Sequence, residues 1–506
     1  MQLGVLVALV LLVITTTAPA LGASARAAEP AVASPEARVR WRSCGRSFQC
    51  GAIFVPVDYS KPNGRRTKVV LARAPALDRK HRIGALVMNF GGPGDPGTES
   101  LRSFVPELPR EIRERYDIVS FDPRGTGASH PIDCISDRAT DTLLAVDPTP
   151  ETDAQLREFY AGKFGRIDLI QSCIDKQDGW LARVGSRNVA RDLDRIRAAL
   201  GERTLVYLGY SYGTVIGAAY AQQFPDRVGR MVLDSPVDLS ETAQAETQED
   251  GASFEHALDA FLRDCARRER CRFYSHGRPR AALGALQRRF EAGLTLPTRR
   301  IDGKRARRRA GVAAFYTALV AELYDKRFGW PDLAYALARA EHGDGTFLLA
   351  LADSYNGRRA NGTYDGLVDS AGIILCADRP DPLQPYDDWV NEYRSAGQDH
   401  PFLGGFLTDT PAGCDPRLPR PSDAELLGDV RATGTAPILV IGTTNDPATP
   451  YAGARDLVTR LAGSRLLTFV STEHTAYPKT ACVQRAVDRY LLDGRLPRAG
   501  TRCRAP

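Results

Sequence analysis

The sequence predicts an α/β protein with a mostly parallel sheet, helices on both faces, and a large helical segment inserted before the last strands. Three observations support this. The chain has 506 residues, 43% hydrophobic and 25% charged, enough for a large core. Apolar runs near both ends stop at turn-forming residues and alternate with a helical period. Between them, about 239–435 reads as helices without strand alternation.

The first half supplies most of the predicted strands. Two stretches of strand-forming residues joined by a Pro/Asn/Gly turn at Pro62–Gly64 are predicted to form a pair of strands. Later apolar stretches end in glycines or polar turns, which is typical of buried parallel strands. A helix is predicted over 188–201, where Val, Leu and Ile recur with helical spacing. The predicted strands of this half are 53–62, 67–76, 84–94, 115–127, 204–210 and 230–238.

The second half defines the domain organisation. Strands return at 436–450 and 464–478, so a core formed by 41–238 and 436–506 would be interrupted by a mainly helical domain, 239–435. We expect this domain to form a lid over the carboxyl edge of the sheet, where open α/β sheets bind ligands.

The N-terminus is typical of a signal peptide. An unbroken apolar run, Leu3–Ile14, is followed by small residues, so residues 1–28 are expected to be removed by cleavage between Ala20 and Ala28. No Lys or Arg precedes the run, and the alternative is an anchor or a buried helix. The expectation is secretion, with no stable membrane anchor after cleavage.

Ten cysteines agree with export. They contain no CxxC pair and no Cys/His cluster with zinc-like spacing, so we expect disulfides, no metal and no cofactor. Sequence does not determine connectivity, and the simplest arrangement joins successive cysteines. Those pairs are Cys44–Cys50, Cys134–Cys173, Cys265–Cys271, Cys376–Cys414 and Cys482–Cys503.

Charge gives little indication of a nucleic-acid partner. The net charge of +6 is small for this length. A basic run at 298–311 could be a nucleic-acid or membrane patch, but no aromatic residues interleave with its charges, which favours a solvated loop within the lid.

Ser211 is the candidate nucleophile. It lies in Gly209-Tyr210-Ser211-Tyr212-Gly213, a G-x-S-x-G pattern between a predicted strand and a predicted helix. A strained turn there would hold the hydroxyl out of the backbone, and only small residues fit two positions before and after it. The alternative is an ordinary tight corner between strand and helix.

Asp446 and His474 are the candidate partners of Ser211. A hydroxyl needs a base, and the base needs an orienting group. Of the seven histidines, His474 follows a predicted buried strand near the C-terminus, and Asp446 follows the strand before it. The order Ser, Asp, His is that of the nucleophile-elbow hydrolases.

Acyl transfer also requires donors for an oxyanion. The main-chain N–H of Tyr212, next to the nucleophile, is one candidate. Gly91 and Gly92, in the loop after an early strand, could provide the other, although a plain Gly/Pro turn is the alternative.

Taken together, these motifs resemble the secreted bacterial tripeptidyl aminopeptidases, relatives of the prolyl iminopeptidases in the α/β-hydrolase superfamily. The resemblance covers about Trp41 to Cys503 and rests on "NFGGPGDPG", "FDPRGTGAS", "GYSYGT", "NDPATP", "EHTAY" and the early "WRSC…CGAIFVPVDYSKP". Phe90 stands where the family has Pro, and Asp95-Pro96 replaces Gly-Ser, so the oxyanion loop departs from the family pattern.

The resemblance implies the α/β-hydrolase fold and a serine exopeptidase that acts on free peptide or protein N-termini through Ser211, Asp446 and His474. Such an enzyme must hold the substrate's ammonium, and the acidic candidates are Glu246, Glu249, Asp250 and Asp378. For each of these residues, ordinary surface charge is the favoured alternative. A secreted carboxylesterase or lipase with the same triad, or a non-catalytic binding protein on this fold, remains an alternative. Epoxide hydrolase or dehalogenase chemistry needs a carboxylate in place of Ser211.

Overall fold

The computed structural model describes residues 38–164, 167–177, 179–299 and 308–505, so the predicted signal peptide and part of the basic run lie outside the described residues. A ten-stranded sheet forms the centre of this part of the chain. Its strands lie in the order β1 (Arg42–Ser43), β2 (Gln49–Pro56), β3 (Arg66–Ala74), β5 (Tyr116–Phe121), β4 (Gly84–Asn89), β8 (Leu205–Tyr210), β9 (Val228–Asp234), β12 (Leu439–Thr443), β13 (Arg465–Val470) and β14 (Arg502–Arg504).

The sheet is mixed, with the antiparallel part at one end. Strands β1, β2, β3 and β5 pair antiparallel, and every neighbouring pair from β5 to β14 is parallel. The carboxyl ends of β4, β8, β9, β12 and β13 therefore open on one edge. These strand ends carry the loops in which the sequence placed its candidate catalytic residues.

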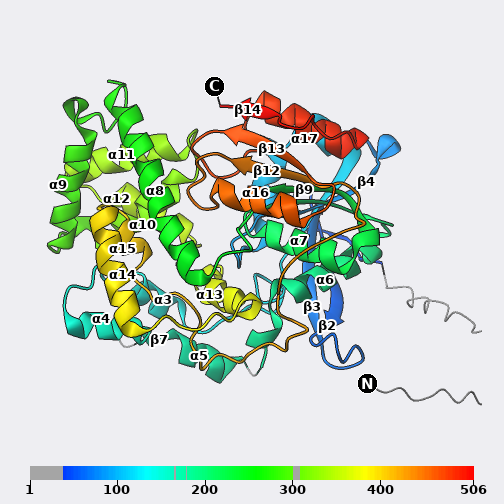
Figure 1. Ribbon diagram of the computed structural model, residues 1–506, viewed down its shortest axis with the longest axis horizontal. Coiled ribbons are helices and arrows are strands. Elements are labelled where there is room, and N and C mark those ends of the chain that lie inside the picture. The colour runs from blue at the N-terminus through cyan, green and yellow to red at the C-terminus, as the bar shows by residue number, and fades with distance from the viewer. Residues whose placement is uncertain (1–37, 165–166, 178, 300–307, 506) are drawn as a thin grey trace, which may run out of the picture. The chain divides into compact units, whose positions relative to one another are not determined.

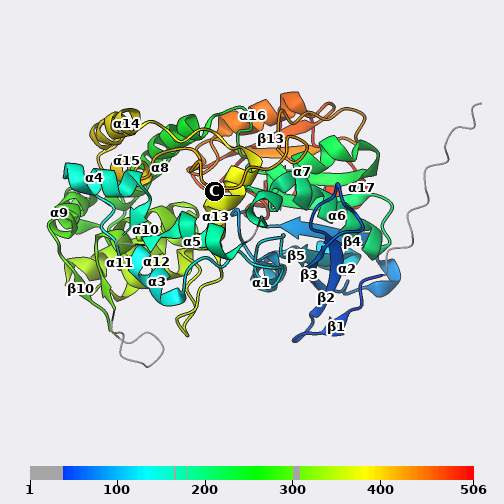
Figure 2. The same cartoon turned by 90° about the horizontal axis from the view of Figure 1, so that it is seen from below.

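Helices cover both faces of the sheet (Figures 1 and 2). Strand β4 has an apolar run, residues 85–88, because it is buried on both sides: Leu86 and Met88 face one core, and Ala85 and Val87 face the other. The first core is closed by α1 (Gly97–Phe104), α2 (Arg110–Arg115) and α17 (Ala481–Asp493). The second is closed by α6 (Ser186–Leu200), α7 (Gly213–Gln223) and α16 (Tyr451–Arg460).

A large helical segment is inserted between β9 and β12, and its helices α8 to α12 gather to one side of the sheet (Figure 1). It has a separate core that includes Phe261, Phe290, Phe315 and Trp330. The segment contains α8 (Ala243–Ala266), α9 (Pro279–Glu291), α10 (Val312–Leu323), α11 (Gly329–Glu341), α12 (Thr346–Tyr355), α13 (Leu367–Asp378), α14 (Tyr386–Asp399), α15 (Gly404–Leu407) and a small pair of strands, β10 (Leu296–Pro297) and β11 (Arg309–Ala310).

A second helical segment, between β5 and α6, was not anticipated. It packs against the inserted helices, because Leu156 and Phe159 share a small core with Trp389 and Val390 of α14. Its elements are α3 (Asp137–Leu143), α4 (Asp153–Tyr160), β6 (Lys163–Phe164), β7 (Ile167–Asp168) and α5 (Leu169–Lys176).

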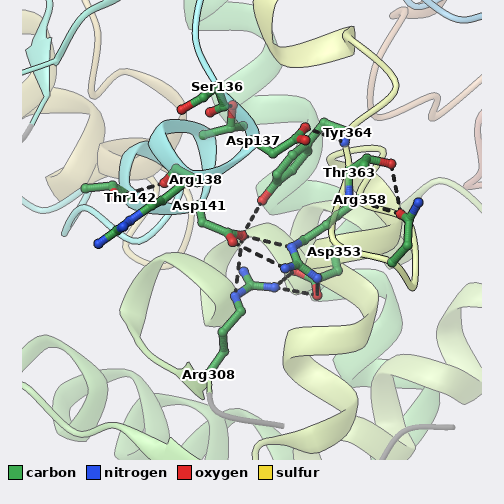
Figure 3. A network of polar contacts seen from close by, with 12 residues as sticks. Ser136, Asp137, Arg138, Asp141, Thr142, Arg308, Asp353, Arg358, Thr363 and Tyr364 are labelled. Atoms are coloured by element: carbon green, nitrogen blue, oxygen red, sulfur yellow. Dashed lines mark hydrogen bonds and ion pairs between the residues drawn. The ribbon is translucent and has the colours of Figure 1, made fainter. Parts of the chain in front are cut away.

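A network of ion pairs reinforces this contact (Figure 3). Asp141 of α3 accepts hydrogen bonds from Arg358 Nε and from the Tyr364 hydroxyl, both at 2.8 Å. Arg308 contacts Asp353 of α12 at 2.6 Å and also lies near Asp141. The α3 segment is thus joined to the inserted segment by several shared charges rather than by one exposed pair.

The structure contains the same five disulfides that pairing successive cysteines gives: Cys44–Cys50, Cys134–Cys173, Cys265–Cys271, Cys376–Cys414 and Cys482–Cys503. No helix among the described residues is both long and apolar enough to cross a membrane. Within the same residues, no group of three or more His, Cys, Asp or Glu side chains is arranged to hold a metal ion.

Candidate active site

Ser211 lies in a sharp turn between β8 and α7. Its φ is +52°, in the left-handed region that an L-residue rarely adopts. The flanking glycines are needed for space: a Cβ on Gly209 would lie 2.5 Å from the Gly213 carbonyl oxygen, and one on Gly213 would lie 2.7 Å from Asn89 Oδ1. The local geometry is that of a nucleophile elbow, with α7 beginning beside the hydroxyl.

Asp446 and His474 are brought together at the ends of β12 and β13. His474 Nδ1 lies 2.8 Å from Asp446 Oδ1, and both side chains are buried. The main-chain N–H groups of Ala448 and Thr449 donate to the same carboxylate oxygen at 3.1 and 3.0 Å. Burial alone would raise the pKa of Asp446, but the His474 ring and the hydrogen-bond donors outweigh it and hold the pKa below its usual value.

Asp234, at the end of β9, contacts both the Ser211 turn and the loop that carries His474. Its carbonyl oxygen accepts the Ser211 N–H at 3.0 Å. Its fully buried carboxylate accepts the N–H groups of Ala476 and Tyr477 at 3.1 and 2.8 Å, just after His474. Burial raises its pKa to about 6, although those N–H donors favour the charged form. Sequence reasoning missed this residue; an acid at the carboxyl end of a buried strand was the available signal.

The structure shows no direct hydrogen bond between the Ser211 hydroxyl and the His474 ring within the described residues. Such bonds are often loose without substrate and tighten in the reacting complex. The two residues are instead related through Asp234, which fixes the backbone beside each of them.

The glycine loop after β4 lies against the elbow. A Cβ on Gly91 would lie 3.0 Å from Ser211 Cβ and 3.1 Å from the Tyr212 nitrogen. The Gly91 N–H itself donates to Asn89 Oδ1 at 3.1 Å, so Gly91 contributes space rather than a free donor. The main-chain N–H groups of Gly92 and Tyr212 have no acceptor among the described residues, which leaves them available to an oxyanion.

The inserted segment contacts the histidine loop directly. The carbonyl of Tyr324, after α10, accepts the His474 N–H at 2.8 Å, and the two rings stand perpendicular with centroids 5.2 Å apart. Lys479 Nζ donates to the His474 carbonyl at 2.7 Å and pairs with Asp325 and Glu473 at 3.0 and 3.1 Å. Burial opposes the charge on Lys479, but the two carboxylates raise its pKa. These contacts place Tyr324 and Asp325 at the site.

A cavity of about 460 Å³ lies between α8 and α13, with walls from α4, α5 and the Cys376–Cys414 disulfide. Two of the four acidic candidates, Glu246 and Asp250, line it. Glu246 is paired with Arg379. Burial and the nearby charges of Glu246, Glu249 and Asp446 raise the pKa of Asp250 well above its usual value, so this carboxyl interacts electrostatically with Asp446, the partner of His474.

The other two candidates differ from each other. Glu249 lies beside Glu241, whose pKa burial and this neighbouring carboxyl raise to about 7. Glu249 Oε2 is buried and has no hydrogen-bond partner among the described side chains and backbone. Asp378 does not line the cavity. It is 3% exposed, and its two oxygens accept hydrogen bonds from the Tyr212 hydroxyl and the Ser186 N–H.

Two family models match the chain: the alpha/beta hydrolase fold over residues 84–292, and TAP-like protein over residues 400–503. Among curated proteins, the chain is 37% identical to serine protease Hip1 of Mycobacterium tuberculosis over 98% of this chain and 96% of that protein. It is 34% identical to carboxylesterase B of the same organism, covering 95% and 92% respectively. It is 30% identical to tripeptidyl aminopeptidase of Streptomyces lividans, covering 94% and 88%. Similarity at this level and coverage, together with the fold, shows that the chain belongs to the TAP-like family of serine hydrolases with the α/β-hydrolase fold.

Proposed function

We propose that this protein is a secreted serine exopeptidase that releases short peptides, with tripeptides the expected product, from free N-termini. In this mechanism His474 takes the proton from Ser211 as the hydroxyl attacks the scissile carbonyl, and Asp446 orients the imidazole. The N–H groups of Gly92 and Tyr212 stabilise the oxyanion. His474 gives that proton to the leaving amine as the C–N bond breaks, which leaves the acyl-enzyme and a neutral imidazole. Water then attacks the acyl carbon, and His474 takes its proton and passes it to the Ser211 oxygen as the peptide acid leaves.

The observation that carries this proposal is a cluster of carboxyl groups, two of which, Glu246 and Asp250, line the cavity. Burial and the neighbouring carboxyl groups of this cluster, Glu241, Glu246, Glu249 and Asp250, raise the pKa of Glu241 and that of Asp250, and Arg379 pairs with Glu246. Grouped acids destabilise each other unless a positive charge joins them. A substrate ammonium would supply that charge, and the electrostatic coupling of Asp250 with Asp446 relates it to the catalytic dyad.

The rest of the cavity is suited to the side chains of a bound peptide. Most of its lining is apolar, so side chains of the first substrate residues would be buried there. The apolar contributors include Tyr160, Ile170, Val368, Ile373, Leu375 and Leu418. Residues 239–435, which supply α8 and α13, would act as the lid that closes this cavity over the sheet edge.

The name tripeptidyl aminopeptidase, which belongs to a relative at 30% identity, supports a peptide substrate with a free amine. The five disulfides and the apolar N-terminal run support export to an oxidising compartment. N-terminal sequencing of the exported protein tests the proposed cleavage between Ala20 and Ala28.

The decisive experiment compares a tripeptide arylamide that has a free amine with the same compound acetylated. The proposal expects cleavage of the free form and loss of at least about a hundredfold in kcat/KM on acetylation, because an unpaired buried charge is costly. Ser211→Ala provides the inactive baseline. Equal rates on both compounds would contradict amine recognition while leaving the hydrolase assignment in place.

A carboxylesterase is the second candidate, because carboxylesterase B is 34% identical to this chain and the cavity is largely apolar. It would turn over short acyl esters with no requirement for an amine. Asp250→Asn separates the two: it should raise KM for free-amine peptides and leave KM for a neutral p-nitrophenyl ester unchanged. An equal effect on both substrates would favour a structural role for Asp250.

A further inference from the structure

Helix α13 of the inserted segment touches two parts of the catalytic centre. Near its start, Ser370 and Leu367 lie against the glycine loop: a Cβ on Gly94 would lie 2.4 Å from Ser370 Oγ and 3.3 Å from Leu367 Cδ1. At its last residue, the Asp378 carboxylate accepts a hydrogen bond from the Tyr212 hydroxyl. One helix therefore contacts the loop on one side of Ser211 and the residue directly after Ser211.

The contact between Asp378 and Tyr212 is closely packed and buried from solvent. The Ser186 N–H donates to Asp378 Oδ1 at 2.5 Å, and Ser186 Oγ lies 3.1 Å from the Tyr212 hydroxyl. Ser186, Tyr212 and Asp378 are 1%, 5% and 3% exposed. A Cβ on Gly185 would lie 2.8 Å from both Asp378 Oδ1 and the Ala377 carbonyl oxygen. A residue with a side chain at position 185 would therefore collide with the end of α13.

These contacts have a direct consequence for the backbone of Tyr212. A tyrosine ring has two side-chain torsions, so anchoring its hydroxyl restricts where its main chain can lie. The next residue, Gly213, begins α7, and the preceding residue has a φ of +52°. The turn is strained, and the buried phenol gives it a fixed point on the helical segment.

We propose that Asp378 is a positioning residue for the oxyanion hole, which holds the Tyr212 phenol and thereby aims the Tyr212 N–H beside Ser211. The inference rests on the proposed role of that N–H. It assigns to Asp378 a role different from ammonium binding, and it makes docking of α13 on the core a condition for full acyl-transfer activity.

The test uses Asp378→Ala, Asp378→Asn, Tyr212→Phe and the double variant Asp378→Ala/Tyr212→Phe in the full-length protein. With a free-amine tripeptide arylamide and with a p-nitrophenyl ester, Asp378→Ala should lower kcat about tenfold or more and leave KM within about twofold. Asp378→Asn should fall between it and the wild type, because the amide keeps one acceptor. The kcat of the double variant should be no lower than that of Tyr212→Phe, because both changes remove the same hydrogen bond between Asp378 and the Tyr212 hydroxyl.

Glu425→Gln is the matched control. This buried carboxylate also reaches the start of α6, through Asn188 Nδ2 at 3.1 Å, but it does not contact Tyr212. It should cost stability without lowering kcat. If Asp378→Ala does not fold, as measured by circular dichroism and thermal melting, Tyr212→Phe decides the matter, because it removes only a hydroxyl.

Three results would overturn the proposal. Unchanged kcat in folded Tyr212→Phe would show that the phenol positions nothing. A raised KM with unchanged kcat in Asp378→Ala, on the free-amine substrate alone, would make Asp378 an ammonium ligand. If the fold-losses in kcat of the two single variants multiply in the double variant, the two side chains act independently. Because the ester needs no amine, these results are readable even if peptides prove not to be the substrate, and Ser211→Ala tests the nucleophile separately.

Discussion

Ser211 and Asp234 are joined by a main-chain hydrogen bond of 3.0 Å, from the N–H of the candidate nucleophile to the carbonyl at the end of the next strand. The carboxylate of the same Asp234 receives the N–H groups of Ala476 and Tyr477. One residue thus sets the spacing between the elbow and the histidine loop. The relation explains how Ser211 and His474, 263 positions apart in the sequence, are given a common reference point.

Asp234→Asn should therefore impair catalysis more than folding. The amide must present an N–H to at least one of two N–H donors, so the loop carrying His474 loosens. We expect kcat/KM to fall about tenfold to a hundredfold, measured with an arylamide substrate. Asp488→Asn is the control, because this carboxylate holds the same loop through the Tyr477 hydroxyl at 2.7 Å without contacting Ser211. Equal losses in both variants would show that loop stability alone is responsible.

Substrate affinity should depend on pH near neutrality. Burial and Glu249 raise the pKa of Glu241 to about 7, so Glu241 is largely protonated below that pH and adds a negative charge to the cluster above it. A peptide α-amine loses its own proton near pH 7.7–8.0. KM for free-amine peptides should thus be lowest between about pH 7 and 8. A flat KM from pH 5.5 to 8 would exclude the cluster as the ammonium site.

The same cluster should make the protein less stable as pH rises. A carboxyl whose folded pKa is raised contributes stability below its unfolded pKa and loses it as pH passes through the folded value, here between about 4.5 and 7 for Glu241. Glu241→Gln should consequently melt higher than the wild type at pH 8 and show little difference at pH 4.5. Thermal melts at the two pH values check this, and a lower melting temperature at pH 8 would contradict it.

Arg124 should be essential for stability rather than for chemistry. It is fully buried, pairs with Asp192 through two nitrogens at 2.6 and 2.7 Å, and donates to the carbonyls of Pro56, Val57 and Arg183. Removing one partner leaves a buried charge, at a cost of about 3–5 kcal/mol. Arg124→Met should lower the free energy of unfolding by that amount in denaturant titration. The fraction that folds should keep its kcat.

Loss of the Cys376–Cys414 disulfide should affect both stability and substrate binding. The bond closes a loop with a sequence separation of 38 residues, for which loop entropy gives about 4 kcal/mol. Both cysteines line the cavity. The double change to Ser should lower the melting temperature and raise KM for peptides. The control is the Cys482–Cys503 disulfide, which does not line the cavity: changing both of its cysteines to Ser should lower the melting temperature and leave KM unchanged.

Short-range patterns predicted most strands of the central sheet and the strand-end loops that carry the candidate site residues. Parallel strands buried on both faces read as apolar runs, as β4 shows, and crowding at Gly209 and Gly213 follows from the turn itself. The α3–α5 segment was missed because its helices are short: α3 has seven residues and α4 has eight. Their packing partner, α14, lies more than two hundred positions later in the sequence.

Other residues depend on contacts that no local pattern contains. Asp378 looks like any acid in a helical segment, yet its carboxylate is buried on Tyr212, 166 positions away. The Gly91 N–H was predicted as a donor to an oxyanion, but in the structure it donates to Oδ1 of Asn89, two residues earlier in the chain. The sequence indicates which residue types lie at the carboxyl edge of the sheet. The hydrogen-bond partner of each residue depends on three-dimensional packing and is seen only in the structure.

The ion pair between Lys479 and Asp325 has a practical consequence for protein engineering. A truncated protein without residues 239–435, or a chimera that carries a foreign cap, would leave the Lys479 ammonium without Asp325, one of its two carboxylate partners. It would also remove the Tyr324 carbonyl that receives the His474 N–H. Grafts should therefore retain Tyr324 and Asp325, so that the rest of the segment can be exchanged while the contacts that support the His474 loop are kept.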